Sequence, residues 1–593
     1  MKSYTRLMVA VVIALGCFAI SARAQDAQPM TLRDAVNGYQ SVTNGHAGLP
    51  EDWSSHHLVF SRPAPGTAAY DKITHDPRYW MQQVRRLRPQ SEAQAVADMQ
   101  LASRILTAAK HGKAWRRRHR LKRDWNVSLG TNGTVGAEMY PAKFSFNPPG
   151  TPDCTNDFVV FNTSLTGSAT QASLVGLNNL YKTTCSATVP KVNWAYNTGG
   201  NAHTSVVLSL DGTQVAFVQS EGSTAHLILL KWKANDGTVA SPTVPTSVAA
   251  ASYRGCTAPC MTDFAFSPTA TPPNDTNSAP YVDYSGDTLY VGADDGTLHK
   301  FTGVFAGTPT EEASPWPVTV HSGTALSSPV FDANSGRIFV GDVTGQLSAV
   351  TASSGAALTP VAIANNSNQI EPIVDPPLVD GSTERVFWFG GANGGNKAAS
   401  VFEQTDTSLA NPRSIVIGNV AGSARPNQPG HAGAFDNAYY SSSSPSITGY
   451  LYVCGITSAT SDVATLYRIG FSSTGVMNTT TASGPLAMSS STSECSPITE
   501  FLNGSTDRIF LGVKANGNLA GTCAGTCTGG GCLYSFDVTS TFPTTCSAKL
   551  TSASGTSGVI IDNDNGTSGA SQVYFTPLTG NNGATQASQA GLN

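Results

Sequence analysis

A short apolar pattern, rich in β-branched and aromatic residues, recurs along the chain and predicts a repeated buried strand. The eight copies are Phe158–Thr163 (FVVFNT), Gln214–Gln219 (QVAFVQ), Thr288–Ala293 (TLYVGA), Arg337–Asp342 (RIFVGD), Arg385–Gly390 (RVFWFG), Tyr450–Gly455 (YLYVCG), Arg508–Val513 (RIFLGV) and Gln572–Pro577 (QVYFTP). Their first residues lie 56, 74, 49, 48, 65, 58 and 64 positions apart. This spacing indicates a structural unit that repeats about every 60 residues.

Polar turns and further short strands flank most copies of this hexapeptide. A strand and a turn precede it at Val206–Gly212, Pro329–Gly336 and Val559–Gly566, and a turn and a third strand follow it at Asp295–Phe301 and Thr344–Val350. Such units form four-stranded antiparallel sheets, each with two apolar faces that it cannot bury alone. Stacking the sheets in a ring buries both faces. We therefore predict an all-β protein, a β-propeller with eight blades, and seven blades as the alternative.

The two ends of the propeller are predicted to meet in one blade, because closure of the ring usually joins both chain ends in a single sheet. Trp125–Leu129 (WNVSL) has the composition of a strand and precedes the first repeat. We expect it to pair in the last blade with Val559–Ile561 and Gln572–Pro577. The predicted propeller covers residues 124–580, and residues 581–593 are expected to form a flexible tail.

The residues before the propeller carry helical signals. A helix is predicted to begin at Asp76 and Pro77, which suit its cap and first position, and its buried face would contain Trp80, Met81, Val84 and Leu87. A second helix is predicted from the capping box of Ser91 and Gln94 onwards. Residues 25–123 are therefore predicted to form a short helical extension.

The first residues have the pattern of an export signal. Lys2 and Arg6 are followed by the apolar stretch Leu7–Ala14 and by Ala22–Ala24, a small-x-small cleavage site. We expect cleavage near Ala24 and a secreted or periplasmic protein. The alternative is a lipoprotein acylated at Cys17, because the residues before this cysteine resemble a lipobox. No later stretch has the length and apolar character of a transmembrane helix.

Charge separates the extension from the propeller. Only 12% of the 593 residues are charged, about half the usual fraction. Residues 25–125 contain 16 Lys/Arg and 9 Asp/Glu, a net charge of +7, whereas residues 126–593 contain 16 and 30, a net charge of −14. Eight of the fourteen residues in Lys110–Arg123 are basic. We interpret this run as a linker against the acidic propeller or a protease-sensitive junction, with binding to a polyanion as the alternative, and expect no nucleic-acid partner.

Ten cysteines follow the leader, and an even number in an exported chain predicts disulfides. Sequence proximity suggests the pairs Cys154 with Cys185, Cys256 with Cys260, and Cys454 with Cys495, and two bridges among Cys523, Cys527, Cys532 and Cys546. The connectivity stays open. A metal site at Cys523, Cys527 and Cys532 is the alternative, although zinc sites usually use paired Cys-x-x-Cys knuckles.

Two repeats resemble a known family. Tyr290–Gly303 (YVGADDGTLHKFTG) and Ile338–Val350 (IFVGDVTGQLSAV) share a rhythm of strand, turn and glycine, and the segment from Asp124 to Phe146 is similar to the start of such propellers. The family is that of the quinoprotein alcohol-dehydrogenase-like (PQQ-like) propellers. The resemblance implies the propeller fold. For catalytic members it also implies PQQ held against a disulfide of adjacent cysteines, a Ca²⁺ ion and an Asp base.

The sequence lacks the features that this chemistry needs. It has no adjacent Cys-Cys pair, and its repeats lack the family's Trp after Gly303 and Gly355. It also lacks Gly-x-Ser-x-Gly, His-Glu-x-x-His and a phosphate loop ending in Gly-Lys-Ser/Thr. Asp562–Gly566 is interpreted as a turn, because its glycine and the position of a bidentate Glu do not fit a Ca²⁺ loop. We expect no bound PQQ or Ca²⁺ and assign no catalytic, cofactor-binding or metal-binding residue.

Single histidine and aspartate residues leave an enzyme as the competing interpretation. His56 and His57 could bind a metal, but we interpret them as exposed or capping residues. Histidines without an evident partner are His203, His226, His299, His321 and His431. Aspartates near predicted strand ends, which we interpret as turn residues, are Asp283, Asp332, Asp375 and Asp436.

The end of the central channel discriminates between these functions. Acidic and histidine side chains that converge there would favour an enzyme, a glycan hydrolase or lyase, since separated carboxyl groups can meet in a propeller. An apolar or Asn/Ser lining would favour a binding protein. We predict a secreted, non-catalytic propeller that acts as a binding or assembly module for an unknown extracellular or envelope ligand, a protein or a glycan.

Overall fold

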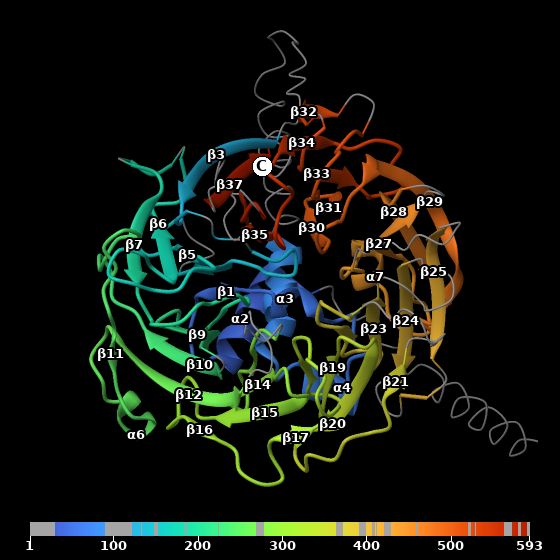
Figure 1. Cartoon of the computed structure of the whole chain (residues 1–593). Coiled ribbons are helices and arrows are strands. Elements are labelled where there is room, and N and C mark those ends of the chain that lie inside the picture. The colour runs from blue at the N-terminus through green and yellow to red at the C-terminus, as the bar shows by residue number, and fades with distance from the viewer. Residues whose placement is uncertain are drawn as a thin grey trace, which may run out of the picture.

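The chain folds into eight blades of short, mainly antiparallel strands in a computed structural model. The structure describes residues 30–88, 121–131, 133, 135–146, 152–182, 184–186, 188–222, 224–268, 278–362, 372–390, 399–405, 409–410, 412–419, 429–457, 461–519, 523–527, 529–562, 572–578 and 583–589. The blades form a β-propeller and surround a central channel, with the first strand of each blade innermost (Figure 1).

The first four blades each begin with their innermost strand. Blade 1 contains β4 (Ala142–Ser145), β5 (Phe158–Asn162), β6 (Leu174–Asn178) and β7 (Lys191–Tyr196). Blade 2 contains β8 (Val207–Leu208), β9 (Gln214–Glu221), β10 (Thr224–Lys231), β12 (Cys260–Pro268) and β11 (Thr246–Ser247), and α6 (Ala250–Tyr253) precedes β12. Blade 3 contains β13 (Tyr281–Asp283), β14 (Thr288–Gly292), β15 (Thr297–Thr302), β16 (Thr310–Glu311) and β17 (Val318–Thr319). Blade 4 contains β18 (Val330–Asp332), β19 (Arg337–Gly341), β20 (Gln346–Thr351) and β21 (Val361–Ala362).

The last four blades complete the ring. Blade 5 contains β22 (Leu378–Asp380), β23 (Arg385–Gly390), β24 (Ala399–Thr405) and β25 (Arg413–Asn419). Blade 6 contains β26 (Ala434–Phe435), β27 (Tyr450–Thr457), β28 (Val463–Phe471) and β29 (Met477–Thr492), with α7 (Asn437–Tyr440) between its first two strands. Blade 7 contains β30 (Thr499–Asn503), β31 (Thr506–Val513), β33 (Cys532–Asp537), β34 (Ala548–Thr551) and β32 (Ala524–Thr526). Blade 8 contains β35 (Ile560–Asp562), β36 (Gln572–Phe575), β37 (Gly583–Gln589) and β3 (Leu121–Ser128).

All eight predicted hexapeptides form the second strand of a blade, which confirms the eight-bladed interpretation. Their side chains are buried on both faces of the sheet; in β5 and β14, for example, every residue is buried. This burial follows from the stacking of each blade against two neighbours. Gly296 lies in the turn that follows one of the hexapeptides. Its φ of +84° favours glycine, and the absence of a side chain leaves room for the carbonyl of His321.

Strand β3 closes the ring in blade 8, as predicted. Its direct partner is β37, with Trp125 opposite Gln586, and β37 pairs in turn with β36. The structure differs from the expected boundaries in two respects, because β37 lies in the residues assigned to a flexible tail and β3 begins at Leu121, inside the residues assigned to the extension. The sequence of β37 (GATQASQ) has small and polar residues, so it gives no strand signal of its own.

The predicted extension does not form a separate unit. Residues 30–88, which we name the channel segment, lie inside the ring (Figure 1). They contain α2 (Leu32–Val42), β1 (Leu49–Glu51), α3 (Ser54–His57), β2 (Leu58–Val59), α4 (Ala68–Ile73) and a helix over residues 77–88. Strand β1 pairs antiparallel with β4 of blade 1, and β2 pairs parallel with β22 of blade 5, so the segment adds inner strands to two blades on opposite sides of the ring.

The helix over residues 77–88 begins at the predicted Asp76–Pro77 pair. Its Met81 and Val84 are buried against Ala35 and Tyr39 of α2, as the helical spacing predicted. The second predicted helix and most of the basic run lie outside the described residues. No helix among the described residues is both long and apolar enough to cross a membrane.

Five disulfides tie neighbouring segments together. The pairs are Cys154–Cys185, Cys256–Cys260, Cys454–Cys495, Cys523–Cys546 and Cys527–Cys532. The three pairs suggested by sequence proximity are confirmed, and the four remaining cysteines form two bridges as expected. The cysteines of the alternative metal site are therefore used in disulfides. Five disulfides indicate an oxidising compartment, such as the extracellular space or the periplasm.

Closure by β3 predicts a large cost for removing Trp125. This side chain is 6% exposed, its ring centroid lies 6.1 Å from that of Tyr574, and its Nε1 donates a hydrogen bond to the carbonyl of Leu180 at 3.1 Å. We expect Trp125→Ala to lower the free energy of unfolding by about 3–5 kcal/mol, measured by chemical denaturation. The matched control is Lys122→Ala in the same strand, whose side chain is exposed; equal effects of the two substitutions would contradict this closure.

Candidate functional site

One end of the channel gathers ionisable side chains from four blades. The inner strands all run in the same direction, so the segments that precede them meet at one end of the ring. Glu138 and Tyr140 precede β4, Asp375 precedes β22, His431 precedes β26, and Glu494 precedes β30. Together with His57 of α3, these five residues form what we name the mouth cluster.

His431 is the centre of the mouth cluster. Its Nδ1 lies 3.1 Å from Asp375 Oδ1 and its Nε2 lies 3.1 Å from Glu494 Oε1, and its side chain is 1% exposed. Burial opposes a charge on this ring, but the two carboxylates outweigh burial and raise the pKa of His431 to about 10. The imidazole is therefore a fixed cation at neutral pH, with both nitrogens engaged.

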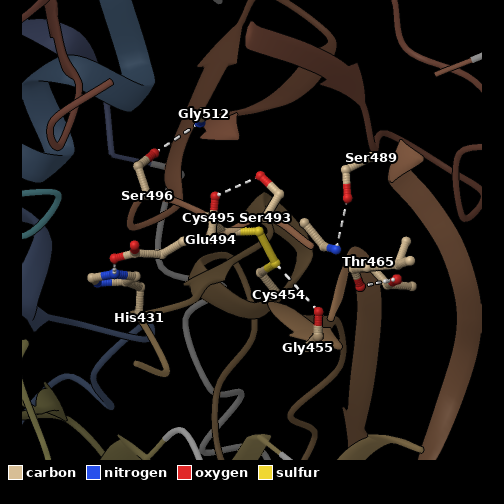
Figure 2. Close-up of a disulfide and its surroundings, with 12 residues drawn as sticks. His431, Cys454, Gly455, Thr465, Ser489, Ser493, Glu494, Cys495, Ser496 and Gly512 are labelled. Carbon is tan, nitrogen blue, oxygen red and sulfur yellow. Dashed lines mark hydrogen bonds and ion pairs between the residues drawn. A yellow bond between two sulfur atoms is a disulfide. The ribbon is translucent and has the colours of Figure 1, made fainter. Parts of the chain in front are cut away.

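Glu494 forms ion pairs with two cations, His431 and Lys514. Burial alone would raise its pKa, but His431 and Lys514, whose Nζ lies 2.9 Å from Glu494 Oε2, lower the pKa to about 2. Figure 2 shows Glu494 next to the disulfide Cys454–Cys495, which joins β27 of blade 6 to the segment before β30 of blade 7. The disulfide thus fixes the backbone that carries Glu494.

Burial shifts the pKa values of three other members of the mouth cluster toward their neutral forms. Burial raises the pKa of Glu138 and raises that of Tyr140 well above its usual value. Burial lowers the pKa of His57 to about 4, despite the nearby Asp375. His57 meets the Tyr140 ring edge-on, with centroids 6.2 Å apart. The prediction that His57 is exposed or a cap is wrong, because α3 lies inside the filled channel.

Three arginines of the helix over residues 77–88 hold the channel segment in place. Arg78 donates to Ser54 Oγ at 2.8 Å and lies over the ring of Tyr281, 4.5 Å from its centroid. Arg85 pairs with Glu51 of β1 at 2.8 Å. These contacts join the helix to α3, to β1 and to blade 3.

Arg86 connects the same helix to blades 6 and 7. It pairs with Glu500 at 2.9 Å, donates to Asn437 Oδ1 at 2.8 Å, and lies 3.4 Å from the centroid of the Tyr440 ring. Burial, and then the neighbouring Glu500, raise the pKa of Asp507 well above its usual value. Arg86 is thus the cation that balances an acidic region between α7 and the start of β31.

The aspartates and histidines that the sequence singled out have different roles in the structure. Asp283, Asp332 and Asp436 accept hydrogen bonds from the backbone of their own turns, as interpreted from the sequence. Asp375 and His431 instead meet in the mouth cluster. Three further histidines have acidic partners that sequence did not indicate, in the pairs His226–Asp263, His299–Glu311 and His321–Asp342. Glu138 and Glu494 were missed, although the position before an inner strand is a signal that could have found them.

The spaces next to these groups are small. A cavity of about 20 Å³ lies beside His431 and Glu494, and one of about 60 Å³ lies between the helix over residues 77–88 and blades 6 to 8. Such volumes hold ordered water, whereas ligand pockets are usually about 300–1,000 Å³. A larger, open depression of about 570 Å³ lies on blade 7, lined by residues 505–506, 537 and 539–547.

The depression on blade 7 has a lining rich in hydroxyl groups. It contains Ser and Thr residues around Phe542, and most of the residues from 539 to 545 are exposed or half-buried. Phe542 stacks parallel to Tyr452 of blade 6, with ring centroids 6.5 Å apart. Disulfide Cys523–Cys546 anchors the loop at Cys546.

The strand pairing thus defines a β-propeller with a filled channel, and comparison with known proteins adds little to this. No protein-family model matches the chain, and no curated protein matches its sequence. Similar solved structures include BamB from Moraxella catarrhalis (10% identity, 79% of this chain and 97% of that chain, TM-score 0.33). They also include Sqt1 from Saccharomyces cerevisiae (10% identity, 79% of this chain and 98% of that chain, TM-score 0.42). A third is the dihydro-heme d1 dehydrogenase NirN (12% identity, 77% of this chain and 84% of that chain, TM-score 0.36). At these scores the similarity supports no functional argument.

The Arg86 contacts predict that the channel segment stabilises the ring. Arg86→Met leaves Glu500 without its buried cation, so we expect a loss of about 3–5 kcal/mol in the free energy of unfolding, measured by chemical denaturation. Arg33→Met, at an exposed position of α2, is the matched control with an expected effect within about 0.5 kcal/mol. Similar values for the two variants would show that the helix does not depend on this contact.

The pair of His431 and Glu494 predicts a pH dependence. The raised pKa of His431 gives a stabilisation that is complete below its ordinary 6.5 and is lost as the pH rises toward about 10. The lowered pKa of Glu494 gives a stabilisation that is complete above its ordinary 4.5 and is lost as the pH falls toward about 2. The difference in Tm between wild type and His431→Gln should therefore be largest between pH 4.5 and 6.5. A difference that does not vary with pH would contradict the paired state.

Proposed function

We propose that this protein is an exported, non-catalytic β-propeller that acts as a binding or assembly module for a protein or a glycan outside the cytoplasm. The observation that carries the proposal is the filled channel. Residues 30–88 occupy the place where propeller enzymes could assemble a substrate pocket, and the cavities beside the ionisable groups have water-sized volumes. The mouth cluster converges as an enzyme would require, but its imidazole is engaged by two carboxylates.

The depression on blade 7 supports a binding role away from the channel. Its volume of about 570 Å³ matches that of a ligand site. Hydroxyl groups around an aromatic ring offer hydrogen bonds and an apolar surface, which suits a glycan or a polar loop of a protein. We propose this depression as the binding surface.

The repeats around Tyr290 and Ile338 support a place among the PQQ-like propellers, within this proposal. The absence of an adjacent Cys-Cys pair in the sequence supports a member that binds neither PQQ nor Ca²⁺. The net charge of −14 over residues 126–593 disfavours a nucleic-acid partner.

A hydrolase or lyase acting on extracellular glycans is the second candidate. It is favoured by Glu138 and Glu494, two carboxyl groups of the mouth cluster whose pKa values are shifted in opposite directions. A pair of this kind supplies a protonated acid and an ionised carboxylate in glycosidases.

A panel of soluble polysaccharides separates the two candidates. For residues 25–593 we expect retention in affinity electrophoresis by a bound polysaccharide, and no release of reducing ends. We also expect no dye-linked oxidation after incubation with PQQ and Ca²⁺. Phe542→Ala should weaken retention at least tenfold, about 1.4 kcal/mol, while Glu138→Gln should leave it unchanged.

Turnover would overturn the non-catalytic proposal. Release of reducing ends that is lost in both Glu138→Gln and Glu494→Gln, with both variants folded by circular dichroism, would establish the enzyme instead.

A further inference from the structure

A lysine and an aspartate meet in a dry site between the first and the last blade. Lys143 lies on β4, the inner strand of blade 1, and Asp562 lies at the end of β35, the inner strand of blade 8. Lys143 Nζ is 2.9 Å from Asp562 Oδ2, and the two side chains are 0% and 1% exposed. An amine and a carboxyl group held in contact away from water are the two reactants of an amide.

Two tyrosines, a second carboxyl group and the hydroxyl of Ser145, which accepts from Lys143 Nζ, surround this pair. Tyr181 Oη lies 3.1 Å from Lys143 Nζ, 2.8 Å from Asp157 Oδ2 and 3.1 Å from Asp562 Oδ2. The hydroxyl of Tyr574 lies 3.4 Å from Asp562 Oδ2. Burial raises the pKa of Tyr181 well above its usual value, so this hydroxyl keeps its proton.

The protons in this network favour a neutral Asp562. Tyr181 has one hydroxyl proton and lies within hydrogen-bond distance of two carboxyl groups, so it can donate to only one of them at a time. Asp157 also accepts hydrogen bonds from the backbone N–H groups of Phe146 at 2.8 Å and Asp153 at 3.1 Å. With Tyr181 donating to Asp157, a proton on Asp562 allows Asp562 to donate to the Tyr181 oxygen.

Burial also favours the neutral amine of Lys143. A separated ammonium and carboxylate are costly where water cannot solvate them. Transfer of one proton from Lys143 to Asp562 gives an amine with a free electron pair next to a protonated carboxyl group. Because the fold holds these two reactants in contact, their reaction does not incur the entropy cost of a bimolecular encounter.

We propose that Lys143 and Asp562 form an intramolecular isopeptide bond. The Nζ electron pair of the neutral lysine attacks Cγ of the protonated Asp562, and the new C–N bond forms as one C–O bond of the carboxyl group breaks. Asp157 takes a proton from Nζ through the hydroxyl of Tyr181, and the same route returns it to the departing hydroxyl, which leaves as water. The reaction consumes no oxidant or other reactant, and its products are one amide and one water molecule.

The position of the bond gives it a structural consequence. Blades 1 and 8 are the two ends of the ring, and β3 closes them from the outer edge of blade 8 by hydrogen bonds and side-chain packing. An amide between β4 and β35 would close the same junction covalently at the inner edge. The ring could then not open between its first and last blades without breaking a covalent bond.

Intact mass spectrometry of the full chain, after reduction and alkylation of the cysteines, tests the proposal. We expect the wild-type mass to be lower than that of the unlinked sequence by one water molecule, and a peptide digest to contain residues 143 and 562 in one cross-linked species. Lys143→Arg keeps the positive charge but should show the unlinked mass. Asp562→Asn should lose one ammonia molecule in place of water, because its amide nitrogen becomes the leaving group.

A substitution of Asp157 tests the proton transfer through Tyr181. Asp157→Asn keeps the size of the side chain but cannot accept the proton, so we expect the unlinked mass. The proposal is overturned if the wild-type protein has the unlinked mass and its digest contains separate peptides with Lys143 and Asp562. That result does not depend on the folding of any variant, and it would leave the two residues as a buried ion pair.

Discussion

Every sheet of this protein has two apolar faces, and the need to bury both determines the rest of the structure. A ring of stacked blades satisfies this need, but a ring of eight leaves an opening along its axis. The inner strands that surround the opening lie at the edges of their blades, where backbone groups can pair with a further strand. Residues 30–88 fill this space, with β1 paired to β4 and β2 paired to β22, so that the chain supplies its own core for the channel.

The same constraint produces the mouth cluster. Because the inner strands run in one direction, residues that precede them meet at one end, whatever their distance in sequence. His431 and Asp375 are brought together in this way and engage each other with Glu494. Buried ionisable groups are tolerated when their charges are balanced, and the shifted pKa values of His431 and Glu494 describe this balance. A cluster of acidic and histidine residues in a propeller therefore does not by itself define an active site.

The repeated strands could be predicted from the sequence because each hexapeptide encodes its own burial. Three disulfides could also be predicted, since their partners are neighbouring cysteines along the chain, whereas the pairing of Cys523 with Cys546 follows from the fold of blade 7. Strand β37 could not, because its small and polar residues follow no hydrophobic period. The position of the channel segment depends on backbone pairing of very short strands and on long-range contacts such as that of Arg86 with Glu500. Contacts between Lys143 and Asp562 need the closed ring, so no local pattern reports them.

Residues 30–88 form the core of the channel and are not an appended extension, and the rest of the structure depends on this placement. Hydrogen exchange of backbone amides, followed by mass spectrometry on the native protein, tests it most directly. We expect peptides covering β1, β2 and residues 77–88 to exchange as slowly as peptides from the inner strands β4 and β22. Exchange of these peptides within the time of an unstructured chain, while the blades stay protected, would contradict it.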